Sequence, residues 1–173
     1  MTDGGWHRGV LLVAGCWLLV AVLAACTATP TDATTATTSS ATVATTFPAG
    51  SLDGFERRGV VVSGAPWTVA VADTPALRSQ GLMGIADLGD LSGMLFVFDD
   101  DTDAGFWMKD TLIPLDVAFF TVDGGFVDLL SMVPCVDDPC PTYHASGPYR
   151  YALEADWGAF AAMDRPSLGF TEG

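Results

Sequence analysis

Residues 106–116 read Phe-Trp-Met-Lys-Asp-Thr-Leu-Ile-Pro-Leu-Asp and contain the only lysine of the 173-residue chain. This lysine, Lys109, stands between an aromatic pair and two carboxylates in an otherwise apolar region. Residues 104–109 predict one strand and residues 115–122 a second. Pro114 fits at the entrance of the second strand, where a missing N–H is tolerated. The stretch therefore predicts two strands joined by a turn that carries charged and aromatic groups.

The sequence on both sides of this stretch consists of short β-branched and aromatic runs separated by Gly, Pro and Asp. Such runs are typical of strands joined by tight turns. Further strands are expected over residues 59–63, 67–72, 93–98, 126–132 and 149–155. Asp123-Gly124-Gly125 predicts a hairpin turn. The acidic run 99–103 is expected to end the strand before it, and residues 133–148 are expected to form a loop.

Two short helices complete the predicted domain. The first is expected over residues 76–83, with Asp73 or Thr74 as its cap and Pro75 in its first turn. A second short helix is expected over residues 157–163. Together, these elements predict an α+β domain that is mostly antiparallel β-sheet, barrel-like or strongly curved, with one or two short helices.

The N-terminus is typical of an export signal. Residues 9–25 are almost continuously apolar, and His7 and Arg8 precede them. The signal ends in Leu-Ala-Ala-Cys, which resembles the lipobox of prokaryotic lipoproteins, where the cysteine is acylated. We therefore expect a signal peptide over residues 1–25 and lipidation of Cys26. This places the protein at the extracytoplasmic face of the cell membrane. An uncleaved signal anchor and simple secretion are the alternatives.

Composition divides the rest of the chain into three parts. Residues 26–54 are rich in Thr and Ala and predict a flexible tether, because they offer too little apolar surface to fold. Residues 55–165 are expected to form the folded domain, and residues 166–173 a C-terminal tail. The formal net charge of −14 comes from 21 acidic and 7 basic residues. Nucleic acid is not an expected partner, because its binding requires clustered Lys and Arg.

Five motifs in the predicted domain share one order along the chain. They are Arg78-Ser79-Gln80-Gly81-Leu82-Met83, Gly93-Met94-Leu95-Phe96-Val97-Phe98, Phe106-Trp107-Met108-Lys109, Ile113-Pro114-Leu115-Asp116 and Arg150-Tyr151-Ala152-Leu153-Glu154. In this order they resemble the DUF192 family, also called UPF0127, a small prokaryotic domain of unknown function. The resemblance implies a compact, mostly β, α+β fold that is often exported or lipid-anchored, and it carries no established reaction.

Two positions depart from the family pattern. The family usually has a basic residue soon after Gly-Leu-Met, where this chain has Gly84 and Ile85. It also usually has Asn after Trp-Met-Lys, where this chain has Asp110. Both changes make the local charge more negative, so any site for an anionic ligand at these positions is weakened.

Cys135 and Cys140 are expected to form a disulfide, because the domain is predicted to lie in an oxidising compartment. A metal or redox pair is the alternative. The aspartates of the acidic run 99–103 faintly resemble a calcium loop, but a solvated turn is the preferred interpretation. The methionines lie in apolar runs, where core packing is their usual role, and His144 stands alone. No metal and no cofactor is predicted.

Charged and aromatic residues of the family motifs and of the loop before the last of them are the candidates for a ligand site. They are Arg78, Trp107, Lys109, Asp110, Asp116, Tyr143, Arg150 and Glu154. Carboxylates beside aromatic platforms suit a saccharide, either for binding or for glycosidic acid/base chemistry. Alternatively, Lys109 and Arg150 pair with Asp116 and Glu154 and only support the fold.

No nucleophile motif or phosphate loop occurs, so the sequence favours a protein that is not an enzyme without deciding the question. The preferred interpretation is a lipid-anchored module that binds a small ligand or an envelope component. The first alternative is an envelope hydrolase that uses Asp110 or Asp116 with Glu154. A structural or assembly factor is the second.

Overall fold

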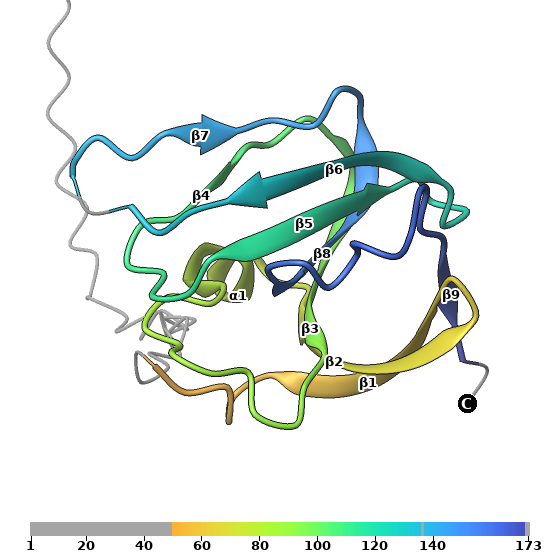
Figure 1. Ribbon diagram of the computed structural model, residues 1–173, viewed down its shortest axis with the longest axis horizontal. Helices are drawn as coiled ribbons and strands as arrows, with labels where there is room; N and C mark the ends of the chain where they lie inside the picture. The colour runs from red at the N-terminus through yellow and green to blue at the C-terminus, as the bar shows by residue number, and fades with distance from the viewer. Residues whose placement is uncertain (1–49, 136, 172–173) are drawn as a thin grey trace, which may run out of the picture. The chain divides into compact units, whose positions relative to one another are not determined.

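The computed structural model describes residues 50–135 and 137–171 (Figure 1). The predicted signal peptide, Cys26 and nearly all of the predicted tether lie outside the described residues. Within the described ranges, no helix is long and apolar enough to cross a membrane.

One seven-stranded sheet forms the domain. Its strands, in chain order, are β1 (Glu56–Val62), β2 (Ala65–Ala72), β3 (Gly93–Thr102), β5 (Leu115–Phe120), β6 (Phe126–Met132), β8 (Tyr149–Asp156) and β9 (Leu168–Phe170). In space the order is β6-β5-β8-β3-β2-β1-β9. The sheet is strongly curled, so that β1 and β2 lie opposite β5 and β6 (Figure 1). The α+β class and the curved, mostly antiparallel sheet are confirmed.

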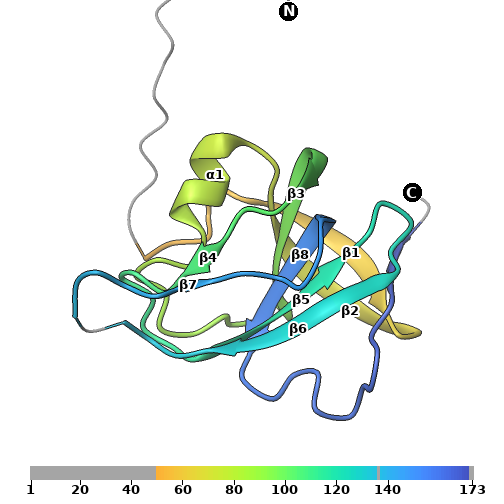
Figure 2. The same ribbon diagram turned by 90° about the horizontal axis from the view of Figure 1, so that it is seen from above.

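A parallel pair interrupts the antiparallel order. Strands β2 and β3 run parallel, and the chain between them contains the helix α1 (Pro75–Gln80). A second, two-stranded sheet pairs β4 (Phe106–Trp107) with β7 (Thr142–Tyr143). Figures 1 and 2 both place α1 close to β4. The helix and the small sheet therefore border the same region of the domain.

Helix α1 begins and ends at residues suited to those positions. The Thr74 hydroxyl accepts a hydrogen bond from the Leu77 amide at 3.2 Å, and Pro75 occupies the first turn. The helix ends at Gly81, whose φ of 48° belongs to the left-handed region that glycine adopts without strain. The prediction that this helix reaches residue 83 is therefore wrong.

The sheet separates two hydrophobic clusters, and alternation along each strand decides which cluster a side chain joins. On β8, Ala152 packs with the cluster that contains Leu77 of α1, whereas Leu153 packs with the cluster that contains Phe160. Because side chains alternate between faces, Glu154 lies on the α1 face together with Ala152.

Several predicted boundaries are wrong. Strand β3 continues through the acidic residues to Thr102, which pairs with Tyr149 beyond a register shift. This solvent-exposed extension tolerates carboxylates, so they do not end the strand. The segment after β8 forms successive turns instead of a helix; its amide-to-carbonyl bonds span three residues, and Gly158 has a φ of 86°. The edge strand β9, which pairs with β1, falls in the predicted tail.

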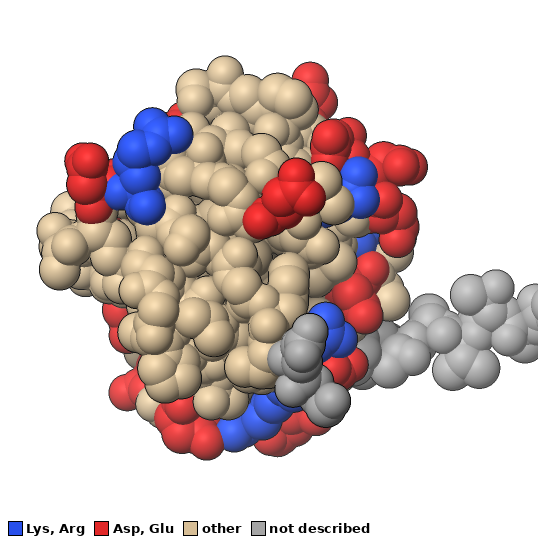
Figure 3. Space-filling view, turned by 90° about the vertical axis from the view of Figure 1, so that its right-hand side faces the viewer, with Lys and Arg blue, Asp and Glu red and all other residues tan. Residues whose placement is uncertain are grey.

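Acidic side chains gather along the margins of the face seen in Figure 3, and another stands within the largely uncharged surface between them. The few Lys and Arg side chains on this face stand beside acidic ones. No basic patch of the kind that binds a phosphate backbone is visible there.

Candidate functional site

A cavity of about 360 Å³ lies between α1, the segment that follows it, β3, β4 and the C-terminal half of β8. Its walls combine aromatic and aliphatic side chains with a few polar groups, a composition typical of small-molecule sites. The lining residues are Pro75, Arg78, Ser79, Gln80, Gly81, Leu82, Met83, Phe96, Phe98, Ala104, Gly105, Phe106, Trp107, Thr111 and Glu154.

Glu154 is the buried ionisable group of this cavity. The residue is 5% exposed, and burial alone raises the pKa of its carboxyl group from 4.5 to about 8. Among the described residues, none donates a hydrogen bond to this carboxyl group or forms an ion pair with it. Among the described residues, no side-chain oxygen is fully enclosed without a hydrogen-bond partner. Because Glu154 lines the cavity, its carboxyl oxygens reach the cavity space. A buried carboxyl group without a partner is costly for the fold and typical of functional sites.

The pairing register of β8 with its two neighbouring strands gives Glu154 apolar surroundings. Glu154 pairs with Met94 on β3 and with Val117 on β5, both of which are buried and apolar. Gly93 allows β3 to approach here, because a Cβ atom at this position would collide with the Glu154 carbonyl oxygen. The carboxyl group is therefore held by two neighbouring strands in surroundings that offer it no donor.

Arg78 lines the cavity from α1. One of its terminal nitrogens, Nη1, donates to the carbonyl oxygens of Asp73 and Val97, each at 2.7 Å. The guanidinium carbon lies 4.9 Å from the centre of the Phe98 ring. These contacts fix the guanidinium, while its Nε and Nη2 groups make no hydrogen bond to any described residue. Arg78 and Glu154 share the cavity without forming an ion pair.

Trp107 is 49% exposed and contributes to the wall from β4. The ammonium group of Lys109 lies 5.7 Å from the centre of the Trp107 ring, which is cation–π distance. Lys109 itself does not line the cavity. The lone lysine therefore contacts the outer part of the candidate site through an aromatic ring.

The backbone of Asp110, and not its side chain, contributes to the structure around the cavity. Its φ of 55° is left-handed, a conformation that Asn and Asp tolerate better than most residues. Its carbonyl oxygen accepts a hydrogen bond from the Gly84 amide at 2.8 Å, and the neighbouring residues Met83 and Thr111 form a β-bridge. Asp110 thus holds the segment after α1 against the turn after β4, and its side chain does not line the cavity.

Three further predicted site residues lie elsewhere. Asp116 lies on the opposite face of the sheet from Glu154, where it accepts hydrogen bonds from the Ser131 hydroxyl at 2.6 Å and the Gly158 amide at 2.8 Å. Arg150 pairs with Asp101 at 3.0 Å. Tyr143, on β7, is not among the lining residues. The cavity therefore brings together Arg78, Trp107 and Glu154 out of the eight candidates.

The alternative prediction, that ion pairs among these charged residues support the fold, is wrong. Lys109 and Arg150 do not pair with Asp116 or Glu154. Asp116 already accepts two hydrogen bonds on the far face of the sheet. Glu154 is buried between the apolar residues Met94 and Val117, and Arg150 pairs with the exposed Asp101 instead.

Tyr149 was missed by sequence reasoning. Its buried hydroxyl donates to the Ala104 carbonyl oxygen at 2.6 Å, and its ring packs against Phe98 and Phe106. Burial, with a smaller contribution from Asp103, raises the pKa of Tyr149. Tyr149 therefore holds the backbone before β4 at the edge of the cavity. In the sequence it is only the first residue of a predicted strand, and nothing there indicates this contact.

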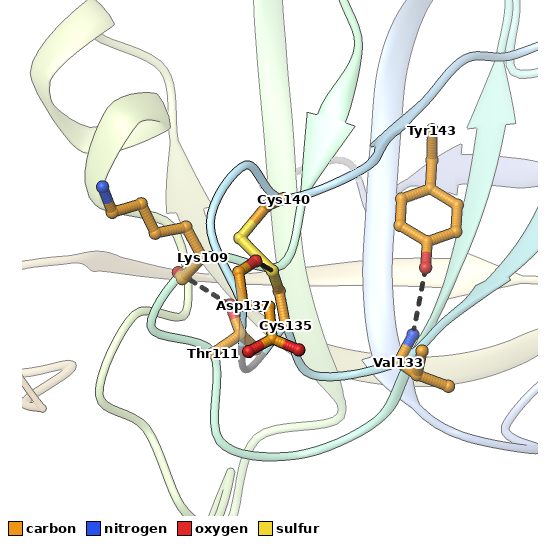
Figure 4. Close-up of a disulfide and its surroundings, with 7 residues drawn as sticks. All are labelled: Lys109, Thr111, Val133, Cys135, Asp137, Cys140 and Tyr143. Atoms are coloured by element: carbon orange, nitrogen blue, oxygen red, sulfur yellow. Dashed lines mark hydrogen bonds between the residues drawn. A yellow bond between two sulfur atoms is a disulfide. The ribbon is translucent and has the colours of Figure 1, made fainter.

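The predicted disulfide between Cys135 and Cys140 is present (Figure 4). Cys135 also forms a bridge to Lys109, so the disulfide loop lies against the turn after β4. The Lys109 side chain points away from the disulfide (Figure 4). Across residues 50–135 and 137–171, no three His, Cys, Asp or Glu side chains are grouped to hold a metal ion.

Comparisons with known proteins agree with this fold. A protein of unknown function from Novosphingobium aromaticivorans DSM 12444 is 28% identical, with a TM-score of 0.61 over 71% of this chain and 91% of that one. A proposed transcription regulator from Sinorhizobium meliloti 1021 is also 28% identical, with a TM-score of 0.59 over 66% of this chain and 93% of that one. No curated protein matches the sequence. The profile of the DUF192 family, described as "Uncharacterized ACR", matches residues 59–165. The chain therefore belongs to the DUF192 family.

Proposed function

We propose that this DUF192 domain binds a small ligand and is held at the extracytoplasmic face of the cell membrane by a lipid on Cys26. The observation that supports ligand binding best is the Glu154 carboxyl group in the cavity beneath α1, without a partner among the described residues. Burying this carboxyl group without a hydrogen-bond partner costs free energy. A ligand that donates a hydrogen bond to it would lower that cost, and binding would be favoured for this reason.

The size and walls of the cavity suit a small organic molecule. The rings of Phe96, Phe106 and Trp107 offer apolar contact, and Ser79 and Gln80 offer polar groups beside them. A saccharide has both kinds of surface, since its ring face stacks on aromatic side chains and its hydroxyl groups form hydrogen bonds. It is one of the ligand classes to be tested.

The geometry supports binding better than hydrolysis by paired carboxylates. Glycosidic acid/base chemistry needs two carboxyl groups about 5–10 Å apart across the reacting bond. Glu154 is the only carboxylate among the lining residues of the described chain, and Asp116 faces the other side of the sheet. A structural or assembly role would not require a cavity. The net charge of −14 argues against extending a nucleic-acid function to this chain.

A ligand screen by thermal shift on the purified full-length protein tests the proposal. Ser79→Trp places a large side chain at an exposed lining position of α1. Ala76→Trp is the matched control, because Ala76 is exposed on the same helix and does not line the cavity. We expect hits that stabilise the wild type and Ala76→Trp but not Ser79→Trp. Hits that Ser79→Trp retains, or the absence of any hit, would contradict the proposal.

A further inference from the structure

We propose that the ligand is a zwitterion of the amino-acid type, whose ammonium group pairs with Glu154 and whose carboxylate binds the free N–H groups of Arg78. This inference rests on the proposed function and narrows its ligand class. It follows from the two charged residues of the cavity, which have opposite signs and do not pair with each other.

The surroundings of Glu154 favour a positively charged group on the ligand. An ionised carboxylate in apolar surroundings is strongly disfavoured unless a cation with hydrogen-bond donors lies against it. A primary ammonium group provides both the charge and the donors. The neighbouring rings of Phe96 and Phe106 add surfaces to which a cation is attracted. A neutral sugar hydroxyl would supply a donor but no charge.

The guanidinium group of Arg78 favours a negatively charged group on the ligand. Because both of its hydrogen bonds to carbonyl oxygens use Nη1, the edge formed by Nε and Nη2 has no hydrogen-bond partner among the described residues. This edge presents two parallel N–H groups, the arrangement that binds a carboxylate through both of its oxygens. The two carbonyl contacts and the Phe98 ring hold the guanidinium in place, so little side-chain entropy is lost when the ligand binds.

The other groups around Glu154 leave this charge pattern unchanged. Its strand neighbours, Met94 on β3 and Val117 on β5, are apolar. Tyr149, on its own strand, donates its hydroxyl to Ala104. Arg78 is the only other charged residue that lines the cavity in the described chain. The apolar walls then accept an aliphatic or aromatic side chain on the ligand.

Binding should depend on pH in a way that a neutral ligand would not show. The ammonium group binds the ionised form of Glu154, whose pKa is about 8 in the free protein. The apparent affinity follows the ionised fraction and should therefore rise about 50-fold between pH 6 and pH 8. A free amino acid keeps its ammonium charge over this range, so the change reports on Glu154.

Isothermal titration of the full-length protein with leucine, methionine, phenylalanine and 6-aminohexanoate tests the inference. We expect at least one of these probes to bind, about 50-fold more tightly at pH 8 than at pH 6. For phenylalanine, N-acetyl-phenylalanine lacks the positive charge, and 2-phenylethylamine lacks the carboxylate while keeping its ammonium charge at pH 8. Each is expected to bind at least about tenfold more weakly than phenylalanine, the loss of one charge-assisted pair.

Variants locate the two contacts. Glu154→Gln should weaken the ammonium-bearing probe at pH 8 and abolish the pH dependence. Arg78→Lys keeps the charge but removes the two parallel N–H groups of the guanidinium. It should weaken probes that carry a carboxylate and leave the binding of 2-phenylethylamine unchanged. Arg150→Gln, which lies outside the cavity, is the control and should bind as the wild type does. Thermal unfolding confirms that each variant is folded, and the modified probes test the wild type independently of any variant.

The possible outcomes separate this inference from the proposed function. If the zwitterions do not bind but another compound does, and Ser79→Trp abolishes that binding, the zwitterion inference is overturned and the proposed function stands. Binding of a zwitterion that is independent of pH and unaffected by Glu154→Gln also overturns the inference. If no compound binds in the cavity, both proposals fail.

Discussion

The substitution Glu154→Gln should stabilise the protein increasingly as the pH rises from 5 to 8. Folding raises the pKa of this carboxyl group from 4.5 to about 8 because it is buried without a partner. A group whose pKa is higher in the folded protein favours folding while it is protonated. This favourable contribution is complete below the unfolded pKa and is lost as the pH rises to the folded pKa.

The magnitude follows from these two pKa values. Between them, the wild-type free energy of unfolding should fall by about 1.4 kcal/mol per pH unit through Glu154 alone. Over the range from pH 5 to pH 8 the loss is about 3 to 4 kcal/mol, a large fraction of the stability of an ordinary domain. Glutamine has nearly the same shape and does not titrate, so this part of the pH dependence should disappear.

Urea unfolding at pH 5, 6, 7 and 8 measures the effect, as the difference in free energy of unfolding between Glu154→Gln and the wild type. Glu56→Gln is the control, because it makes the same chemical change at an exposed position of β1. Its difference from the wild type should change little over this range. If the profiles of Glu154→Gln and the wild type run parallel from pH 5 to pH 8, the reasoning about Glu154 is refuted.

Four further predictions concern other parts of the chain. Thr74→Ala removes the cap of α1 and should cost about 1 kcal/mol in urea unfolding, whereas no loss would show that the hydrogen bond to Leu77 is unimportant. Asp110→Ala should cost about 1 to 2 kcal/mol because of its left-handed backbone, and Asp110→Asn should cost much less; equal losses would contradict a backbone role. Replacing Cys135 and Cys140 together by Ser should lower stability by about 2 kcal/mol, and free thiols in the native protein would count against the disulfide. Cys26→Ser should release the protein from the membrane or leave an uncleaved precursor, and a wild-type N-terminus at another residue would argue against lipidation.

The strands of the domain were predictable because their side chains are patterned locally. The runs around Val69, Leu95 and Val117 are buried, and the Gly-rich turn before β6 has the expected hairpin form. The boundaries that failed depend on tertiary contacts. Strand β9 forms because β1 offers a free edge, and the extension of β3 forms because β8 pairs with it across a register shift. A sequence pattern does not record either partner.

Part of the candidate site was predictable, because three of its residues belong to motifs that are visible in the sequence. Trp107, Arg78 and Glu154 were identified as motif residues, and they meet in one cavity. Their separation from Asp116 depends on strand parity across β5 and β8, which places neighbouring motif carboxylates on opposite faces. The isolation of Glu154 was not visible in the sequence, where a pairing of Lys109 and Arg150 with Asp116 and Glu154 was the alternative to a ligand site. Arg150 instead reaches Asp101 on the extension of β3.

The lone lysine also has a different role from the one that the opening stretch suggested. Residues 106–116 build one wall of the cavity through Phe106, Trp107 and Thr111. Lys109 does not line the cavity, and its ammonium group lies at cation–π distance from the Trp107 ring. The stretch therefore contributes shape to the candidate site, and the charges come from α1 and β8.

The most direct test of the account is the carboxyl signal of Glu154 in carbon-13 NMR. The sequence contains only three glutamates, Glu56, Glu154 and Glu172, so protein labelled at the glutamate side-chain carboxyl carbon gives three signals. Glu154→Gln assigns one of them. The account predicts that this signal titrates near pH 8 and shifts when a ligand that Ser79→Trp excludes is added. A Glu154 signal that titrates near pH 4.5, or that does not respond to such a ligand, would contradict the claim that this carboxyl group is the centre of a ligand site.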